Sequence, residues 1–338
     1  MVTKNIEYCG GVDVGGTKIA SALFDADGGM TARAKVAVDA SGGDRAAAQV
    51  SAEVRRLGEA AAAAGGRLRA VGVCVPGIAY GATGRVWAPN IPGWDMYPLL
   101  EKIGRAEKEK GRVPEGHAPI VLESDRSAYV MGEAWRGAAA GAADAVFLAV
   151  GSGIGAGILA GGRLVRGHED IAGAVGWFGL DPEFRPEYAA MGCFEAEASG
   201  NSVGRKARER LAAGHPSLMT EIAGGRIESV TAETVAEAAR RRDPLALEVA
   251  AGAARYLAMG IANIVSLLDP EVVVLGGGLF RAADVFFEPV RREFRKWAQP
   301  VAAEKVRLVL SALGEDAGLY GCGRLAWDRA GGARRTKR

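Results

Sequence analysis

The sequence predicts an α/β protein with two lobes, each built on a layered sheet. Three observations support this fold class. In the first third of the chain, strand-like and helix-like patterns follow one another as βββαβαβα, which favours a sheet covered by helices. A strand, glycine turn and strand at residues 10–28 are echoed at residues 145–160. The length of 338 residues exceeds one domain of ordinary size.

The segment 10–28 carries the strongest functional signal. An apolar run ends in Val12-Asp13-Val14, the turn is Gly15-Gly16-Thr17-Lys18, and a second apolar run covers residues 19–24, a pattern that predicts a β-hairpin. Glycines let the backbone approach a ligand closely, and N–H groups at a tight bend form an anion site. A Thr hydroxyl and a Lys ammonium suit a phosphate, and Asp13 could hold a metal ion or its water. An ordinary hairpin with a polar tip is the alternative.

Periodicity and breaker residues predict the elements that follow. The Ala-rich stretch 44–64 has apolar residues at helical spacing, and Gly65-Gly66 ends it. Two prolines make residues 88–94 a loop. The predicted order is strand 31–38, helix 44–64, strand 68–75, an irregular segment to residue 94, helix 97–108, polar insertion 108–117, strand 119–122 and helix 126–135.

The second part of the chain repeats the opening pattern and then becomes mostly helical. A predicted strand at 145–150 leads into Gly151-Ser152-Gly153-Ile154-Gly155 and a second apolar run at 156–160. Two related lobes, each with one phosphate-facing turn, would form a cleft between them. The later predicted elements are helices 192–211, 231–241 and 244–268, strand 271–275, helix 282–297, strand 306–310 and helix 317–327.

Composition restricts the class of protein. A net charge of +2 gives no field that would attract nucleic acid. The N-terminus lacks the apolar core of a signal peptide, and no apolar run approaches the roughly 20 residues that span a bilayer. The four cysteines are scattered without a CxxC pair, which is typical of reduced thiols. We therefore expect a cytoplasmic protein without membrane or nucleic-acid partners, and a disordered basic tail at 331–338.

The glycine turns do not fit two common nucleotide motifs. After Gly153-x-Gly155-x-Gly157 comes another strand rather than the helix that a dinucleotide-binding turn requires. Residues 15–18 lack the Walker spacing. A hairpin type of phosphate clamp, with one turn from each lobe, remains. A third turn, Gly276-Gly277-Gly278, could pack against a purine or could be a tight connection between strand and helix.

These residues resemble motifs of the ROK family (repressors, open reading frames and kinases), sugar kinases of the actin-like ATPase superfamily. Residues 12–18 resemble its first phosphate motif, and the other matching stretches follow in one order over about residues 12–326. Those stretches are 75–77, 88–94, 122–125, 151–155, 172–173, 192–195, 274–278 and 314–319. Each stretch is a weak signal, whereas the ordered set is specific.

The resemblance implies a two-lobed actin-like ATPase (ribonuclease H-like) fold with an interlobe cleft. A small lobe would comprise residues 1–122 and a C-terminal helix at about 315–330, and a large lobe residues 123–314. The implied activity is ATP-dependent transfer of the γ-phosphoryl group to a hydroxyl of a sugar, amino sugar or related polyol, with Mg²⁺ bridging the phosphates. A homodimer or higher homo-oligomer is also implied.

The resemblance also assigns roles to individual residues. Asp125 would be the general base, Asn90 and Glu195 would contact the sugar, and Asp13 would hold Mg²⁺ through water. The phosphates and the adenosine would be held by the glycine turns, at Gly15, Gly16, Thr17, Lys18, Gly151, Ser152 and Gly153 for the phosphates and at Gly276, Gly277 and Gly278 for the adenosine.

Each role has a purely structural alternative. Asp125 stands where a strand meets a helix, a position that also favours a helix-capping Asp. Asn90 could be a loop residue whose side chain bonds its own backbone. Glu195 could be a first-turn acid that the helix dipole favours.

Several departures from the family pattern bear on substrate and metal. Family kinases usually have Asn before the general base, where this chain has Ser124, so one sugar contact would be weakened or water-mediated. Their Gly-Glu-x-Gly-His stretch is Gly173-Ala174-Val175-Gly176-Trp177 here. Of the His and three cysteines that commonly bind a structural zinc, only Cys193 remains, and one thiolate cannot complete a tetrahedral site, so we expect no zinc. Trp177 could stack on a sugar or fill the volume of the absent metal site.

The same scaffold has two other functions as alternatives. A non-catalytic sugar sensor would not need Asp125, Asp13 and both glycine turns. A DNA-binding repressor of the family carries a helix-turn-helix module ahead of the hairpin, and here the hairpin begins within the first dozen residues. We therefore expect a kinase.

Overall fold

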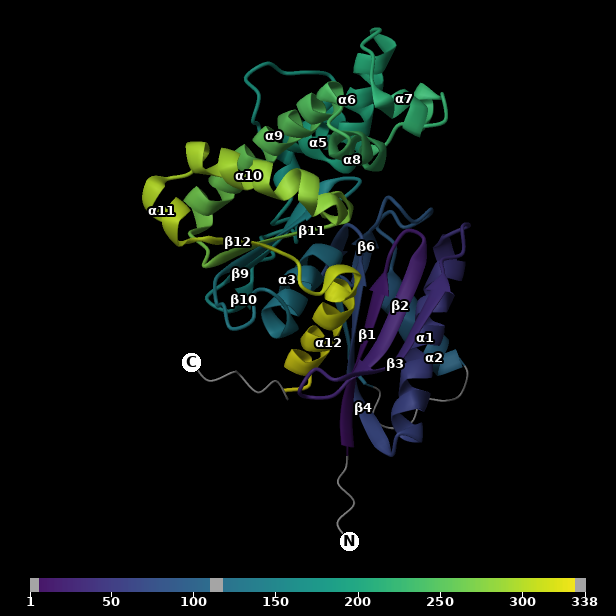
Figure 1. Cartoon of the computed structure of the whole chain (residues 1–338). Coiled ribbons are helices and arrows are strands. Elements are labelled where there is room, and N and C mark those ends of the chain that lie inside the picture. The colour runs from purple at the N-terminus through teal and green to yellow at the C-terminus, as the bar shows by residue number, and fades with distance from the viewer. Residues whose placement is uncertain (1–5, 110–117, 332–338) are drawn as a thin grey trace. The chain divides into compact units, whose positions relative to one another are not determined.

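The computed structural model describes residues 6–109 and 118–331, and its contacts divide the chain into two units, which Figure 1 shows. The first unit comprises Met1–Gly141, Leu164–Ala172 and Glu315–Arg338, and the second Ala142–Arg163 and Gly173–Gly314. The first boundary falls after residue 141 rather than 122, because helix α3 (Asp125–Arg136) packs on helix α12 (Ala317–Arg329) of the same unit. Most of the predicted insertion 108–117 and of the tail 331–338 lies outside the described residues.

The sheet of the first unit begins with the predicted hairpin. Its five described strands are β1 (Ile6–Val14), β2 (Lys18–Phe24), β3 (Met30–Ala37), β4 (Gly66–Val75) and β7 (Ile120–Ser124), in the order β3-β2-β1-β4-β7. Strands β1, β2 and β3 pair antiparallel, and Val14 pairs with Ile19 across the turn. Strands β1, β4 and β7 run parallel. The carboxyl ends of β1, β4 and β7 therefore meet at one edge of the sheet.

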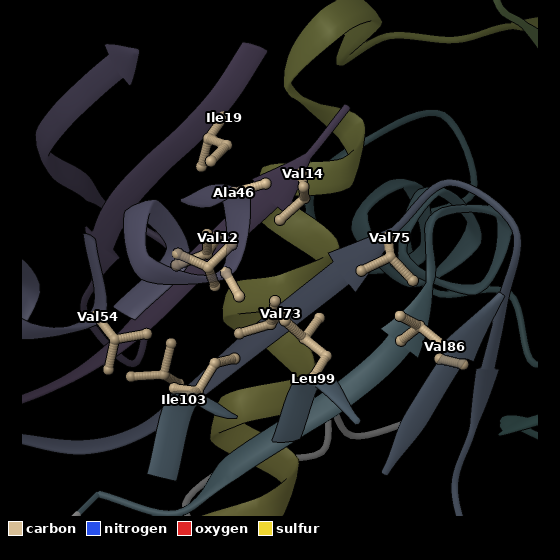
Figure 2. Packing of buried hydrophobic residues seen from close by; sticks show 14 of the residues in the cluster. Val12, Val14, Ile19, Ala46, Val54, Val73, Val75, Val86, Leu99 and Ile103 are labelled. Atoms are coloured by element: carbon tan, nitrogen blue, oxygen red, sulfur yellow. The ribbon is translucent and has the colours of Figure 1, made fainter. Parts of the chain in front are cut away.

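Alternate residues of these strands face two different cores. Val12 and Val73 belong to a large cluster with helix α1 (Gly43–Ala63) and helix α2 (Leu99–Glu109), part of which Figure 2 shows. Cys74, next to Val73, instead packs with Cys322 of α12. Because side chains alternate along a strand, the sheet has helices on both faces, as predicted for an α/β layered fold.

The segment to residue 94, predicted as irregular, contains a short hairpin. Strands β5 (Ile78–Tyr80) and β6 (Arg85–Trp87) pair antiparallel, and Val86 bridges to Tyr97. The loop that follows is anchored by Trp94, which is buried, stacks on Tyr97 and donates from Nε1 to the Gly43 carbonyl at 3.1 Å. This anchoring places residues 88–93 beside the N-terminus of α1.

The sheet of the second unit repeats the arrangement. Its described strands are β8 (Ala145–Val150), β9 (Ile154–Ala160), β10 (Arg163–Leu164), β11 (Val272–Gly276) and β12 (Arg307–Leu310), in the order β10-β9-β8-β11-β12. Strands β8 and β9 form an antiparallel hairpin around the second glycine turn, and β8, β11 and β12 run parallel. The predicted echo of the first hairpin is confirmed.

The predicted helices of the second unit are present, one of them divided in two, and short helices at 188–191, 218–222 and 300–305 were not predicted. The predicted helix 192–211 is two helices, because Ser199 is extended and its hydroxyl caps the second one at the Ser202 N–H. The helices of this unit are α4 (Tyr188–Met191), α5 (Cys193–Ala198), α6 (Gly200–Ala212), α7 (Leu218–Ile222), α8 (Ala232–Arg240), α9 (Pro244–Leu268), α10 (Ala283–Trp297) and α11 (Pro300–Lys305).

Among the described residues, helix α9 alone is long and apolar enough to cross a membrane by length and composition. It begins at the Asp243 cap with Pro244 at its first position and ends at Asp269 in the left-handed conformation. Its inner face packs against α5, α8 and α10, and residues such as Leu257 and Ile261 are fully buried. These are the contacts of a core helix, which passes the same test of length and composition.

Two glycines inside helices provide a matched test of the packing of α12. A Cβ at Gly321 would lie 1.8 Å from the Ala128 carbonyl oxygen of α3, whereas a Cβ at Gly58 of α1 would meet only Leu68 at 4.0 Å. Both Gly→Ala changes remove backbone freedom from the unfolded chain, a gain of about 0.5–1 kcal/mol.

We expect Gly58→Ala to raise the urea midpoint of unfolding. We expect Gly321→Ala to lower that midpoint, because the backbone must move and the free energy of unfolding falls by a net amount of about 1–3 kcal/mol. The measurement is urea unfolding of both variants. Equal stabilisation by the two changes would contradict the close packing of α12 on α3.

Candidate active site

Asp125 lies at the carboxyl edge of the first sheet, as the first residue of α3. Its Oδ1 accepts the Arg126 N–H at 2.8 Å, and its Oδ2 accepts the Tyr129 hydroxyl at 3.4 Å. Ser124, not Asp125, is the residue that precedes the helix. Burial raises the pKa of Asp125, and the Arg126 charge opposes that rise. The side chain is partly exposed, so the carboxyl is both accessible and poorly hydrated.

A second carboxyl, that of Asp13 at the end of β1, lies in the same unit and within electrostatic range of Asp125. Its Oδ1 accepts the Cys74 thiol at 3.2 Å. A Cβ at Gly318 of α12 would lie 2.5 Å from its Oδ2, so the helix backbone closes over the carboxyl. Burial is the main reason why the pKa of Asp13 rises from 3.8 to about 6, and the negative charge of Asp125 adds to the effect.

The first glycine turn stands beside Asn90. The Gly15 N–H bonds the Lys18 carbonyl at 2.8 Å, which closes the turn. A Cβ at Gly16 would lie 3.2 Å from the Asn90 Cβ, and both residues are exposed. The Lys18 ammonium forms an ion pair with Glu315 at 2.9 Å. The structure thus brings two predicted site residues together and gives Lys18 a carboxylate partner that the sequence did not indicate.

The second glycine turn is tied to Glu195. Its Oε2 accepts the Ile154 N–H at 2.7 Å. Burial raises the pKa of Glu195, and this hydrogen bond partly offsets the rise. The Gly151 carbonyl accepts the Gly200 N–H at 2.7 Å, so the turn also bonds the first residue of α6. Glu195 is therefore more than the first-turn acid of a short helix. It fixes a turn that was predicted to hold phosphates.

A cavity of about 470 Å³ lies in the second unit beside this turn. Gly151 and Ser152 border it together with Gly278, so the structure brings the second and third glycine turns to one cavity. Arg208, Glu233 and Arg281 also line it. Their charges would meet phosphate oxygens or ribose hydroxyls, and small glycine walls leave room for a planar ring.

The region of the absent zinc motif contains an ionic network. Glu197 is buried and bonds Lys206, Tyr188 at 2.6 Å and Arg185 at 3.3 Å. In the described part of the chain no three His, Cys, Asp or Glu side chains are grouped to hold a metal. The absence of zinc nevertheless stays a prediction.

Trp177 does not fill the volume of that site, since it is 59% exposed. Phe178, the next residue, stacks on Phe194 with ring centroids 6.4 Å apart and 9° between the planes. The Cys193 thiol accepts the Leu180 N–H at 3.4 Å. Trp177 therefore remains available to a ligand, while its neighbour packs the interior.

The sequence did not indicate the residues that bond the predicted site residues from positions far away in the chain. Cys74 and Glu315 bond Asp13 and Lys18 across sequence separations of 61 and 297 residues. No local pattern marks such partners. Arg126 differs, because it directly follows Asp125 and its adjacency could have been weighed.

Solved structures of carbohydrate kinases share this fold. A ROK hexokinase from Thermus thermophilus superposes with a TM-score of 0.79 at 30% identity, covering 96% of this chain and 99% of that one. A ROK family glucokinase from Streptomyces griseus, in complex with glucose and AMPPNP, gives a TM-score of 0.76 at 30% identity, covering 95% and 99%. The fold and site thus define a carbohydrate kinase with the actin-like ATPase fold.

The chain belongs to the ROK family, whose model matches residues 9–329. The glucokinase of Thermotoga maritima is 32% identical over 264 residues, which is 78% of this chain and 80% of that protein. The family also includes regulators. The DNA-binding transcriptional repressor Mlc of Escherichia coli is 27% identical over 240 residues, 70% of this chain but 55% of that protein.

The bond from Ile154 to Glu195 separates two roles for this carboxylate. Glu195→Gln keeps an oxygen that can accept the N–H, whereas Glu195→Ala removes it. Because a hydrogen bond to a charged group is worth about 1.5–3 kcal/mol, we expect Glu195→Ala to weaken AMPPNP binding by about tenfold or more and Glu195→Gln to weaken it far less. Calorimetric titration measures this. If both variants bind AMPPNP as tightly as the original protein, Glu195 does not support nucleotide binding and only its proposed contact with the sugar remains.

Proposed function

We propose that the protein is an ATP-dependent phosphotransferase that moves the γ-phosphoryl group to a hydroxyl of a sugar, amino sugar or related polyol, with Asp125 as general base. The observation that carries this is the Asp125 carboxyl itself. It is accessible and held at two oxygens by Arg126 and Tyr129, and burial raises its pKa. The names of the relatives and the AMPPNP and glucose complex support the donor and acceptor classes.

The chemistry asked of Asp125 is the removal of one proton. Phosphoryl transfer depends mainly on positioning and charge neutralisation, and a carboxylate beside the attacking hydroxyl accepts its proton in the transition state. A raised pKa makes the carboxylate a stronger base. Its bond to the Arg126 N–H keeps one oxygen fixed and leaves the other, which accepts the Tyr129 hydroxyl at 3.4 Å, to face the acceptor.

Asp13 fits a role in holding Mg²⁺ through water. Magnesium in phosphotransfer sites is commonly bound by one or two carboxylates together with substrate phosphates. Asp13 supplies one such carboxylate, whose Oδ1 accepts the Cys74 thiol and whose Oδ2 lies close to the backbone of α12 at Gly318. Mg²⁺ would supply neutralisation of the phosphate charge. Gly15 to Lys18 would give their N–H groups and side chains to the phosphates.

The second unit would bind the nucleotide. The cavity that Gly151, Ser152 and Gly278 border has room for a purine nucleoside, and the resemblance already assigned its phosphates and adenosine to these turns. Gly276 and Gly277 complete the third turn. Their N–H groups would face the adenosine while the Arg208 and Arg281 side chains approach its phosphate or ribose.

The acceptor contacts are proposed at Asn90, Ser124, Glu195 and Trp177. Asn90 is exposed next to the first glycine turn, and Trp177 is exposed with an aromatic face for a sugar ring. Glu195 would reach a sugar only with the oxygen that Ile154 does not use. Cytoplasmic location and a homodimer or higher homo-oligomer complete the proposal.

A non-catalytic sugar sensor is the second candidate, and the repressor relative favours keeping it. A sensor would bind a sugar without needing a base or a phosphate clamp. Here both carboxylates and both glycine turns are present and built into bonded positions, which supports catalysis.

Replacing the proposed base tests the function directly. Asp125→Asn keeps the shape and the Arg126 N–H bond but cannot take a proton. We expect kcat for sugar phosphorylation to fall by about 10²–10⁴-fold, with AMPPNP affinity within about twofold of the original. A coupled ADP-release assay over a panel of sugars measures it. No acceptor above background hydrolysis, together with wild-type behaviour of Asp125→Asn, would favour the sensor.

The raised pKa of Asp13 predicts a stability cost. The folded chain holds this proton up to about pH 6, and the unfolded chain only to about 3.8, so the contribution to stability falls as pH rises through that window. The ionised carboxyl then destabilises the fold by roughly 2–3 kcal/mol. We expect Asp13→Asn to be inactive yet more stable than the original at pH 8.

Chemical unfolding at pH 8 and pH 4 measures this effect, and the difference between the two proteins should vanish at the lower pH. Asp27→Asn, in an exposed turn, is the matched control and should change stability little. A less stable Asp13→Asn at pH 8 would contradict the proposed electrostatic cost.

A further inference from the structure

The guanidinium of Arg126 lies beside the proposed base and forms no ion pair with a carboxylate among the residues that the structure describes. Its Nε donates to the Ser124 hydroxyl at 3.2 Å, and its Nη2 to the Gly77 carbonyl at 3.5 Å. Nη1 donates to no group among residues 6–109 and 118–331. Arginine has five N–H donors arranged as a planar fork, so the Arg126 guanidinium has further N–H groups that a ligand can accept from.

Neither of the neighbouring acids, Glu123 and Asp125, forms an ion pair with the Arg126 guanidinium. Glu123, buried at 4% exposure, is already held by Arg166, whose Nε and Nη2 both lie 2.7 Å from its Oε2. Asp125 attracts Arg126 electrostatically, but within the described part of the chain no carboxylate forms an ion pair with it. Arg126 is only partly exposed, and burial lowers its pKa. A partly buried, unpaired charge is costly unless a ligand compensates it.

Hydrogen bonds fix the Arg126 guanidinium relative to Ser124, one of the residues proposed to contact the sugar. Ser124 Oγ donates to the Gly77 carbonyl at 2.9 Å while it accepts from Arg126, so the hydroxyl, the β4–β5 turn and the guanidinium form one bonded group. This group directly adjoins Asp125. The guanidinium is therefore held in a fixed position beside the proposed base.

We propose that Arg126 is a specificity-determining residue and that the acceptor is an acidic sugar or polyol, whose carboxylate lies a few bonds from the hydroxyl that is phosphorylated. The inference rests on the proposed function and narrows its acceptor class. A guanidinium binds a carboxylate with two parallel N–H bonds, a geometry that selects it over a neutral hydroxymethyl group.

The transferred phosphoryl group is another anion that Arg126 could meet. A substitution of Arg126 would affect reaction rates differently depending on whether it binds the phosphoryl group or an acceptor carboxylate. A contact with the phosphoryl group is made with every acceptor, so its loss slows all of them equally. A contact with an acceptor carboxylate is made only with acidic acceptors, so its loss removes their advantage and spares neutral analogues.

The test uses pairs of acceptors that differ in one carboxylate, namely D-gluconate with D-sorbitol, D-glucuronate with D-glucose and D-galacturonate with D-galactose. Phosphorylated product is measured by mass spectrometry and ADP release gives kcat and KM. We expect at least one acid to exceed its neutral partner in kcat/KM by about tenfold or more. Arg126→Gln should lower kcat/KM for that acid, relative to kcat/KM for its neutral partner, by about 10- to 100-fold.

Arg126→Lys keeps the charge without the fork and should recover part of the loss, which a merely structural role would not give. Arg136→Gln, at the exposed far end of α3, is the matched control and should change neither acceptor. Melting temperatures check that the variants fold. Neutral partners used as well as the acids, or equal losses on both in Arg126→Gln, would overturn the inference and leave the kinase standing. No phosphorylated product from any acceptor would overturn the proposed function itself.

Discussion

The site depends on the close approach of α12 to the first sheet and to α3. At Gly321 the helix lies so near Ala128 that no Cβ fits, and at Gly318 its backbone covers the Asp13 carboxyl. This contact joins the C-terminal end of the chain to its first strand. It removes water from the edge where β1, β4 and β7 end. The carboxylates at that edge therefore sit in a medium that the sheet alone would not provide.

That exclusion of water sets the electrostatics of the first unit. Two acids, Asp13 and Asp125, are held within range of each other, and burial raises the pKa of both. Lys18 is paired with Glu315 and Arg166 with Glu123, whereas the charge of Arg126 opposes the rise in the pKa of Asp125. The net effect is a raised pKa for both carboxyls. Under the proposed function, stability is given up at the positions of the base and of the metal-holding group, a common feature of functional sites.

The sequence predicted local features well and distant partnerships poorly. The two hairpins follow from turn glycines between apolar runs, and α9 follows from its cap, proline and periodicity, so each is specified by neighbours in the chain. The pair β5 and β6 was missed because its strands have only three residues each and lie among turn residues. The break at Ser199 was missed because the bond from Gly200 to Gly151 is a tertiary one. For the same reason the site residues were predicted from motif order, while Cys74 and Glu315 were not.

The distribution of charge between the units has a chemical consequence. Cationic side chains that would attract a nucleotide, Arg208 and Arg281, belong to the cavity of the second unit, whereas the proposed base belongs to the first. A cation next to a carboxylate lowers its pKa and weakens it as a base. If Arg208 and Arg281 bind the nucleotide as proposed, the residues that bind its phosphates belong to a different unit from Asp125. Arg126 is the exception, and an acceptor carboxylate that engages it would offset its charge and restore the basicity of Asp125 when substrate is bound.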